Sequence, residues 1–214
     1  MKNITITVNG RPFTYIDESE EMVYENVGQI DVDECIRLLK NFKCVFESIG
    51  IPFYLAYGTL LGAVREKAFI KGDNDIDVFT TDEKLLYNSL PILSEKGFRV
   101  VRIMKGRLYS FKNSSDCYID VYILRKLCFL NPWSTYCYNL EHFAVPKRFF
   151  KEYQDIDLYG ETYRCPKNPE ALLEWWYGKD WRIPQSKKGI YETRSIYYIK
   201  NVIKFFTLWN LWHK

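Results

Sequence analysis

The 214-residue chain lacks several features that mark common classes of protein. It has only two histidines, His142 and His213, so His-based activation of a nucleophile has few routes. Its six cysteines form no CxxC pair and no Cys/His cluster at zinc spacing. There is no apolar signal region at the N-terminus and no apolar run long enough to span a bilayer. We therefore expect free thiols in a reducing, cytoplasmic compartment and no disulfide framework.

Three well-known ligand-binding motifs are also missing. No GxxxxGK[ST] phosphate loop occurs, and residues 58–62 (GTLLG) do not match GxGxxG. The aspartates within residues 73–77 fit the first positions of an EF-hand. However, Val78 stands where its turn glycine belongs and Lys84 where its bidentate Glu belongs. An EF-hand is therefore excluded.

The composition is that of a globular protein, with 47% hydrophobic and 27% charged residues. Alternating strand and helix patterns predict one α/β or α+β domain with a mixed sheet. This domain is expected over residues 1–190, followed by a separate segment, 191–214. The expected strands are 53–57, 98–104, 107–112 and 118–124, and residues 70–79 are expected to form a turn that runs into a further strand. The expected helices are 31–50, 60–66, 82–96 and 169–176, and the expected hairpins are 1–16 and 155–165.

Charge is concentrated near the C-terminus. The net charge of +3 is too small to indicate nucleic acid, but residues 179–214 hold eight Lys or Arg and two acids. On a helical wheel, residues 191–214 have a basic sector opposite an apolar one. Such a helix either contacts a membrane surface or packs on its own domain, and both readings stay open. The polar sector comprises Lys200, Asn201, Lys204 and Thr207, and the apolar one Tyr198, Ile199, Val202, Phe205, Phe206 and Trp209.

Acidic residues within apolar strand patterns indicate a metal site. Asp75 and Asp77 are two positions apart, so on a strand their side chains share one face. Carboxylates this close repel unless a cation lies between them, and oxygen ligands favour Mg²⁺ or Mn²⁺. Asp120 lies in a similar apolar run. The alternative for the first two acids is a solvated turn, which the apolar residues between and after them make less favourable.

A possible phosphate-binding segment precedes the acids. Gly58 and Thr59 lie between a predicted strand and a predicted helix, where backbone N–H groups gather to receive an anion. Arg65, Lys67 and Lys71 follow before the acids begin. A phosphate cradle, cationic side chains and a metal site within twenty residues indicate phosphoryl or nucleotidyl transfer.

These motifs resemble the hallmark of the LicD family. The resemblance rests on residues 54–65 (YLAYGTLLGAVR), 69–70 (FI), 73–77 (DNDID) and 119–121 (IDV), with a weaker closing pattern over 169–184. It extends over about residues 35–185. Departures include Glu66 and Ala68 in place of the family's usual His and Gly, and Asn74 in place of Asp.

The resemblance implies a nucleotidyltransferase-like fold and transfer of a phospho-alcohol, such as phosphocholine. The donor would be CDP-linked, for example CDP-choline, and the product CMP. The acceptor would be a hydroxyl of a cell-surface glycan, as in lipopolysaccharide or teichoic acid, or of its lipid-linked precursor. The enzyme would then lie in the cytoplasm or at the inner face of the membrane.

Residue roles follow from the resemblance together with the chemistry of the side chains. Asp75 and Asp77 would hold Mg²⁺, and Asp120 would complete a second metal site or take the proton of the acceptor hydroxyl. Arg65 would stabilise charge on the phosphate, unless it only pairs with Glu66 or Asp73. Phosphate would be bound by Gly58, Thr59, Lys67 and Lys71.

Two other functions fit the same acids. A nucleotidyltransferase would move NMP from an NTP and release pyrophosphate, and a non-catalytic domain would bind a nucleotide or glycan. Trp175, Trp176 and Trp181 could form a sugar platform or choline cage, but core packing is the more common role of such a cluster.

Overall fold

The computed structural model describes residues 1–20, 31–71, 73, 75–113, 117–127, 137–140 and 143–184. Its contacts divide the chain into two compact units, Met1–Lys167 and Asn168–Lys214, which are treated separately. The predicted boundary at residue 190 and the tail segment 191–214 lie outside the described residues and stay predictions.

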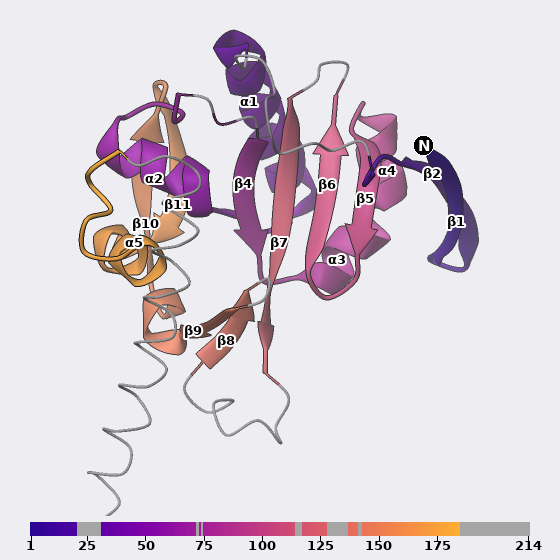
Figure 1. Ribbon diagram of the computed structural model, residues 1–214. Helices are drawn as coiled ribbons and strands as arrows, with labels where there is room; N and C mark the ends of the chain where they lie inside the picture. Colours follow the sequence, from indigo (N-terminus) through magenta and orange to yellow (C-terminus); the bar gives the residue numbers. More distant parts are fainter. Residues whose placement is uncertain are drawn as a thin grey trace, which may run out of the picture. The chain divides into compact units, whose positions relative to one another are not determined.

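A mixed seven-stranded sheet forms the centre of the first unit (Figure 1). Among the described strands of this sheet, β4 and β7 run parallel and every other pairing is antiparallel. The sheet confirms the predicted mixed α/β architecture. Its main path is β3 (Tyr54–Leu55), β4 (Asp75–Thr80), β7 (Tyr118–Lys126), β6 (Leu108–Lys112) and β5 (Arg99–Met104), with β8 (Cys137–Leu140) and β9 (Phe143–Pro146) continuing from β7.

One face of this sheet packs against helices. In Figure 1, α1 (Val32–Ile49), α3 (Glu83–Asn88) and α4 (Leu90–Glu95) lie behind the strands. The buried ring of Phe42 in α1 lies 5.8 Å from Phe98 and 6.5 Å from Phe111 of β6. Side chains alternate along a strand, so Ser110, next to Phe111, belongs to the opposite face.

Two hairpins accompany the main sheet. β1 (Lys2–Val8) and β2 (Arg11–Asp17) are joined by Asn9-Gly10, both with positive φ, as a tight hairpin turn requires. β10 (Tyr153–Leu158) and β11 (Glu161–Pro166) form the second hairpin. Both confirm the sequence predictions. A 3-10 helix, η1 (Lys147–Phe150), precedes β10, and α5 (Pro169–Tyr177) begins the second unit.

Two predicted helix boundaries are wrong. α2 spans Tyr57–Arg65 and starts three residues early, because the N–H of Leu60 already bonds to the carbonyl of Ala56. The predicted helix over 82–96 divides at Ser89 into α3 and α4. Pro91, in the first turn of α4, has no N–H and so cannot continue the hydrogen-bond ladder of α3.

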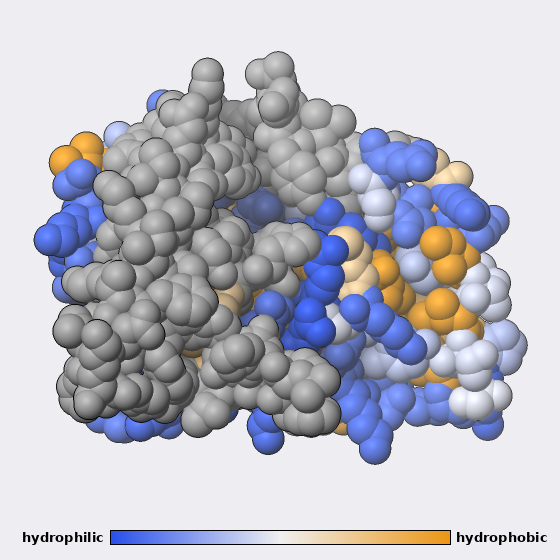
Figure 2. Space-filling view, turned by 60° about the horizontal axis from the view of Figure 1, so that its bottom comes forward, coloured by the Kyte–Doolittle hydropathy of each residue, from blue (hydrophilic) through white to orange (hydrophobic). Residues whose placement is uncertain are grey.

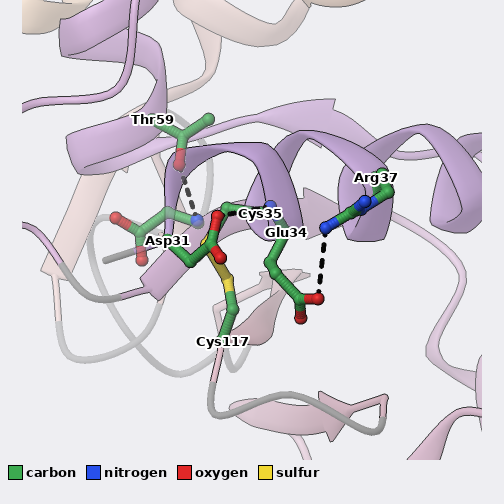
Figure 3. The surroundings of a disulfide bond; sticks show 7 residues. Asp31, Glu34, Cys35, Arg37, Thr59 and Cys117 are labelled. Carbon is green, nitrogen blue, oxygen red and sulfur yellow. Dashed lines mark hydrogen bonds and ion pairs between the residues drawn. A yellow bond between two sulfur atoms is a disulfide. The ribbon is translucent and has the colours of Figure 1, made fainter. Parts of the chain in front are cut away.

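The prediction of free thiols is wrong for one pair of cysteines. Cys35 and Cys117 are 82 positions apart in sequence and form a disulfide (Figure 3). Cys35 lies in the first turn of α1, and Cys117 immediately precedes β7. Only the packing of α1 on the sheet brings them together, so their sequence spacing carried no signal. Cys44, Cys137 and Cys165 are free.

The described surface is mostly hydrophilic on the face drawn in Figure 2, with hydrophobic residues in separate groups. Among the described residues, no helix combines the length and apolar character needed to cross a membrane.

Candidate active site

The start of α2 is anchored on Asp77 of β4. The N–H of Ala56 donates to the Asp77 carbonyl at 3.0 Å, and the N–H of Gly58 donates to Asp77 Oδ2 at 2.8 Å. In return, the N–H of Asp77 donates to Oγ1 of the buried Thr59 at 2.8 Å. Gly58 and Thr59 therefore shape the surroundings of an acid. Their predicted contacts with phosphate stay predictions.

This close approach explains two glycines of α2. A Cβ on Gly58 would lie 2.4 Å from Asp73 Oδ2 and 3.1 Å from Asp77 Oδ2. A Cβ on Gly62 would lie 2.3 Å from the carbonyl oxygen of Ala68. The 2.4 and 2.3 Å distances are too short for a Cβ unless the neighbouring atoms move. The residue before Gly58, Tyr57, has φ of 35°, a strained value of the kind that concentrates at functional sites.

Three aspartates meet at this point. A side-chain hydrogen bond joins Asp73 to Asp75. Burial raises the pKa of Asp75 well above its usual range, and the charges of Asp77, Asp73 and Asp120 raise it further. Burial and the charges of Asp73 and Asp120 likewise raise the pKa of Asp77, although hydrogen bonds from Gly58 and Tyr122 oppose them. The cluster is therefore short of positive charge.

Asp120 completes the acidic group from the neighbouring strand. It is paired with Asp77 in the register of the parallel strands β4 and β7, so both side chains lie on one face of the sheet. Asp120 is 1% exposed and Asp77 6% exposed. The structure thus brings together the three acids that the sequence singled out, and adds Asp73.

Asp120 also has partners that the sequence analysis missed. One guanidinium nitrogen of Arg102 donates to both of its carboxylate oxygens, at 3.0 and 2.8 Å, and Ser110 Oγ donates to Oδ1 at 2.5 Å. Arg102 lies on β5 and Ser110 on β6. The available signal for Arg102 was its position as a charged residue within the apolar run of β5. Tyr122, which hydrogen bonds to Asp77, could have been found from its position two residues after Asp120, on the same face of β7.

The basic residues predicted to bind phosphate are Arg65, Lys67 and Lys71. Arg65, at the end of α2, pairs with Glu66, with Nε 2.9 Å from Oε1. That is the alternative the sequence left open. Lys67 and Lys71 are exposed. Their roles toward phosphate stay predictions, as does that of Arg65.

The acids fit a divalent cation in chemical character. Carboxylates whose pKa values are raised by burial and by mutual repulsion gain stability when a cation neutralises them. Asp75 and Asp77 would hold Mg²⁺ or Mn²⁺, which would supply charge stabilisation at a phosphate. Within the described part of the chain, no group of three or more His, Cys, Asp or Glu side chains is placed so that it could hold a metal ion. Metal binding therefore stays a prediction.

A pocket of about 370 Å³ lies away from the acids, lined partly by Ile123, Arg125 and Lys126 of β7. Because Asp120 lies near the other end of β7, this pocket is separate from the acid site.

Trp176 and Trp181 in the second unit are buried, as core packing requires. His142 and His213 lie outside the described residues.

The fold is similar to those of solved nucleotidyltransferases. The antibiotic-resistance factor ANT(2'')-Ia matches with a TM-score of 0.52 and 14% identity, over 86% of this chain and 99% of that one. The lincosamide antibiotic adenylyltransferase LnuA matches with a TM-score of 0.48 and 13% identity, over 78% and 96%. The predicted nucleotidyltransferase-like fold is confirmed.

Sequence comparison gives the family. A 45-residue stretch is 44% identical to the lipopolysaccharide cholinephosphotransferase LicD of Haemophilus influenzae, covering 21% of this chain and 17% of that protein. The family model for the LicD/FKTN/FKRP nucleotidyltransferase domain matches residues 50–168, which include all the predicted site residues. Since that match spans more than half of the sequence, the chain belongs to the LicD/FKTN/FKRP nucleotidyltransferase domain family.

Proposed function

We propose that the chain is a metal-dependent phosphotransferase. It moves a phospho-alcohol from a CDP-linked donor to a hydroxyl of a glycan or a lipid-linked glycan precursor, and releases CMP. The observation that carries the proposal is the group of buried aspartates on β4 and β7 beside the start of α2, in a chain of this family. The name of the H. influenzae relative supports phosphocholine as the group and lipopolysaccharide as the acceptor.

The proposed reaction is a displacement at phosphorus. The acceptor oxygen forms a bond to the phosphorus of the donor's phospho-alcohol while the bond from that phosphorus to the bridging oxygen breaks. CMP leaves with the bonding electrons, and Asp120 takes the hydroxyl proton. Asp75 and Asp77 would hold the cation. Gly58, Thr59, Arg65, Lys67 and Lys71 would bind the donor's phosphates.

Thermal stability and product release together test the proposal. Ligands that bind the native state raise its melting temperature, so CDP-choline, CDP-ribitol, CTP and ATP are compared with and without Mg²⁺. We expect a Mg²⁺-dependent shift with a CDP-alcohol and CMP release in the presence of acceptor. In Asp77→Asn, CMP release should fall by at least about 100-fold.

Asp157→Asn is the matched control, because Asp157 is an exposed aspartate on β10. It should keep wild-type turnover. Pyrophosphate release from an NTP would instead make the chain a nucleotidyltransferase. Nucleotide or glycan binding without turnover or Mg²⁺ dependence would make it a non-catalytic binding domain. Unchanged turnover in Asp77→Asn would contradict the metal assignment.

A further inference from the structure

The pocket of about 370 Å³ lies at the carboxyl end of the two parallel strands. β4 ends at Thr80 and β7 at Lys126, and the lining includes Thr81 and the end of β7 from Ile123 to Lys126. In Figure 1 this is the end of β7 that continues toward β8. Ligands of open α/β sheets bind outside the carboxyl ends of the strands, and small-molecule pockets begin at about 300 Å³. The position and the volume of the pocket therefore both fit a ligand.

This pocket does not extend to the acids. Asp120 lies six positions before Lys126 on β7, so at about 3.3 Å per residue the two are about 20 Å apart along the strand. The described residues that line the pocket do not include Asp73, Asp75 or Asp77. A ligand in the pocket therefore has contacts of its own, apart from those of the proposed metal site.

Two cations line the pocket at the end of β7. Arg125 and Lys126 are both exposed, and within the described ranges no carboxylate lies at ion-pair distance from either of them. Arg125 Nε donates instead to the neutral amide oxygen of Asn139 at 3.3 Å. Neighbouring Arg and Lys side chains of this kind are suited to the oxygens of a phosphate. This side of the pocket therefore favours an anionic group.

Aromatic rings form another part of the lining. Tyr138 and Phe150 lie with their ring centres 6.0 Å apart, and Tyr153 completes the group. Further cations lie over two of these rings, since Lys147 Nζ is 5.3 Å from the centre of Tyr138 and the Arg164 guanidinium is 5.6 Å from that of Tyr153. The rings offer flat apolar surfaces within a basic setting. Such surfaces suit the C–H faces of a sugar ring in an anionic ligand.

Polar groups from the segment after β4 complete the pocket. Glu83 and Thr81 bring a carboxylate and a hydroxyl to the lining. The carboxylate is held in place, because Glu83 Oε1 accepts hydrogen bonds from the Gly106 N–H at 2.6 Å and from the Tyr109 hydroxyl at 2.8 Å. A carboxylate beside aromatic rings suits a ligand that carries hydroxyl groups, which donate to it. This feature favours a sugar over the flat base of a nucleotide.

We propose that the pocket binds a phosphorylated sugar. Arg125 and Lys126 contact the phosphate, the aromatic rings pack against the sugar ring, and Glu83 and Thr81 bind its hydroxyl groups. Binding involves neither the aspartates nor a metal, so it is independent of the proposed function. The same ligand chemistry occurs in a free sugar phosphate and in a phosphorylated sugar unit of a glycan.

Calorimetry on the full chain in EDTA tests the proposal. The probes are glucose 6-phosphate, N-acetylglucosamine 6-phosphate and ribose 5-phosphate, with glucose and inorganic phosphate as the separate halves. At least one sugar phosphate should bind about tenfold tighter than either half, because it makes both sets of contacts. Lys126→Gln should weaken that binding by about tenfold, and Lys126→Arg, which keeps the charge, should stay within about threefold of wild type.

Lys96→Gln is the matched control, because Lys96 is an exposed lysine at the end of α4 and does not line the pocket. It should bind as wild type does. Equal affinities of Lys126→Gln and Lys96→Gln would overturn the proposal, and so would an absence of binding by all three sugar phosphates. Inorganic phosphate binding as tightly as every sugar phosphate would also overturn it, because the pocket would then be a simple anion site.

Two further measurements separate this pocket from the acid site. Asp77→Asn should keep wild-type affinity for the sugar phosphate. Affinity lost in Asp77→Asn but kept in Lys126→Gln would place the ligand at the acids and overturn the proposal. Displacement of the sugar phosphate by CMP would overturn it too, because the pocket would then be a nucleotide site. Failure of the chain to release CMP in turnover assays leaves all these affinities unchanged.

The source of the sugar phosphate is identified by blocking its anomeric oxygen. Methyl glucoside 6-phosphate carries a methyl group where a glycan chain would continue. If it binds as well as glucose 6-phosphate, the pocket accepts a phosphorylated unit within a glycan. If only glucose 6-phosphate binds, the ligand is a free sugar phosphate. Either result supports a phosphorylated sugar as the ligand.

Discussion

At the scale of single residues, the raised pKa values of Asp75 and Asp77 link stability to both pH and metal. Without a cation, the folded chain protonates Asp75 at higher pH than the unfolded chain does. The contribution of Asp75 to folding stability is therefore fully present below its ordinary pKa, the value in the unfolded chain. It is lost as the pH rises from that value to the raised pKa of the folded chain. A bound divalent cation would remove this loss.

Asp75→Asn should therefore stabilise the metal-free chain increasingly as pH rises from 4 to 8. For a chain of this size, each kcal/mol of repulsion that the substitution removes should raise the melting temperature of Asp75→Asn above that of the wild type by about 2–4 °C. Melting curves in EDTA and in Mg²⁺ check this, with Asp157→Asn as control. Mg²⁺ should raise the melting temperature of the wild type but not of Asp75→Asn. Parallel curves for wild type and Asp75→Asn at all pH values would contradict the expectation.

At the scale of elements, the disulfide ties the first turn of α1 to the start of β7. It closes a long loop, since its cysteines are 82 positions apart, and so restricts the unfolded chain. Asp120 lies three residues beyond Cys117, so the same bond restrains the strand that carries the third acid. A disulfide is uncommon in a reducing cytoplasm, and its presence does not fit the predicted cytoplasmic location.

Reduction, or Cys117→Ser, should lower the free energy of unfolding by about 2–4 kcal/mol. Urea unfolding with and without dithiothreitol measures this. Cys44→Ser is the control, because Cys44 is a free, exposed thiol. If the wild type is insensitive to reductant and matches Cys117→Ser, the bond does not form in solution and the prediction of free thiols stands.

Secondary structure followed from local sequence wherever local chemistry set the boundary. Asp31 accepts a hydrogen bond from the Glu34 N–H, and Gly50 ends α1 with positive φ, as expected for caps. The start of α2 could not be predicted in this way. It depends on hydrogen bonds to Asp77, a residue about twenty positions away that reaches α2 only through the sheet.

At the scale of the whole molecule, membrane contact is predicted only from residues 191–214. The exposed large hydrophobic residues among those described are Met1, Ile16, Val32, Ile92 and Ile183. These are single side chains spread along the sequence, which is ordinary for a protein surface. The basic and apolar sectors of the tail are therefore what a membrane experiment should address.

Lys200→Glu combined with Lys204→Glu should weaken binding to anionic vesicles by at least about tenfold, since each Lys near such a surface is worth about 1 kcal/mol. Co-sedimentation of the full chain with phosphatidylcholine vesicles, with and without phosphatidylserine, measures this. Lys96→Glu with Lys151→Glu changes charge equally at exposed positions and should have little effect. Equal binding by both double variants would refute the membrane role of the tail.

The sequence by itself determined the family, the mixed α/β fold and the acids Asp75, Asp77 and Asp120. These depend on short motifs and on the two-residue period of strands, and both can be recognised within short stretches of the sequence. Only the tertiary structure decided that Cys35 bonds Cys117, that α2 is anchored on Asp77, and that Arg102 and Ser110 hold Asp120. Those contacts join different strands and helices, so they depend on strand order and register, which local sequence patterns do not encode.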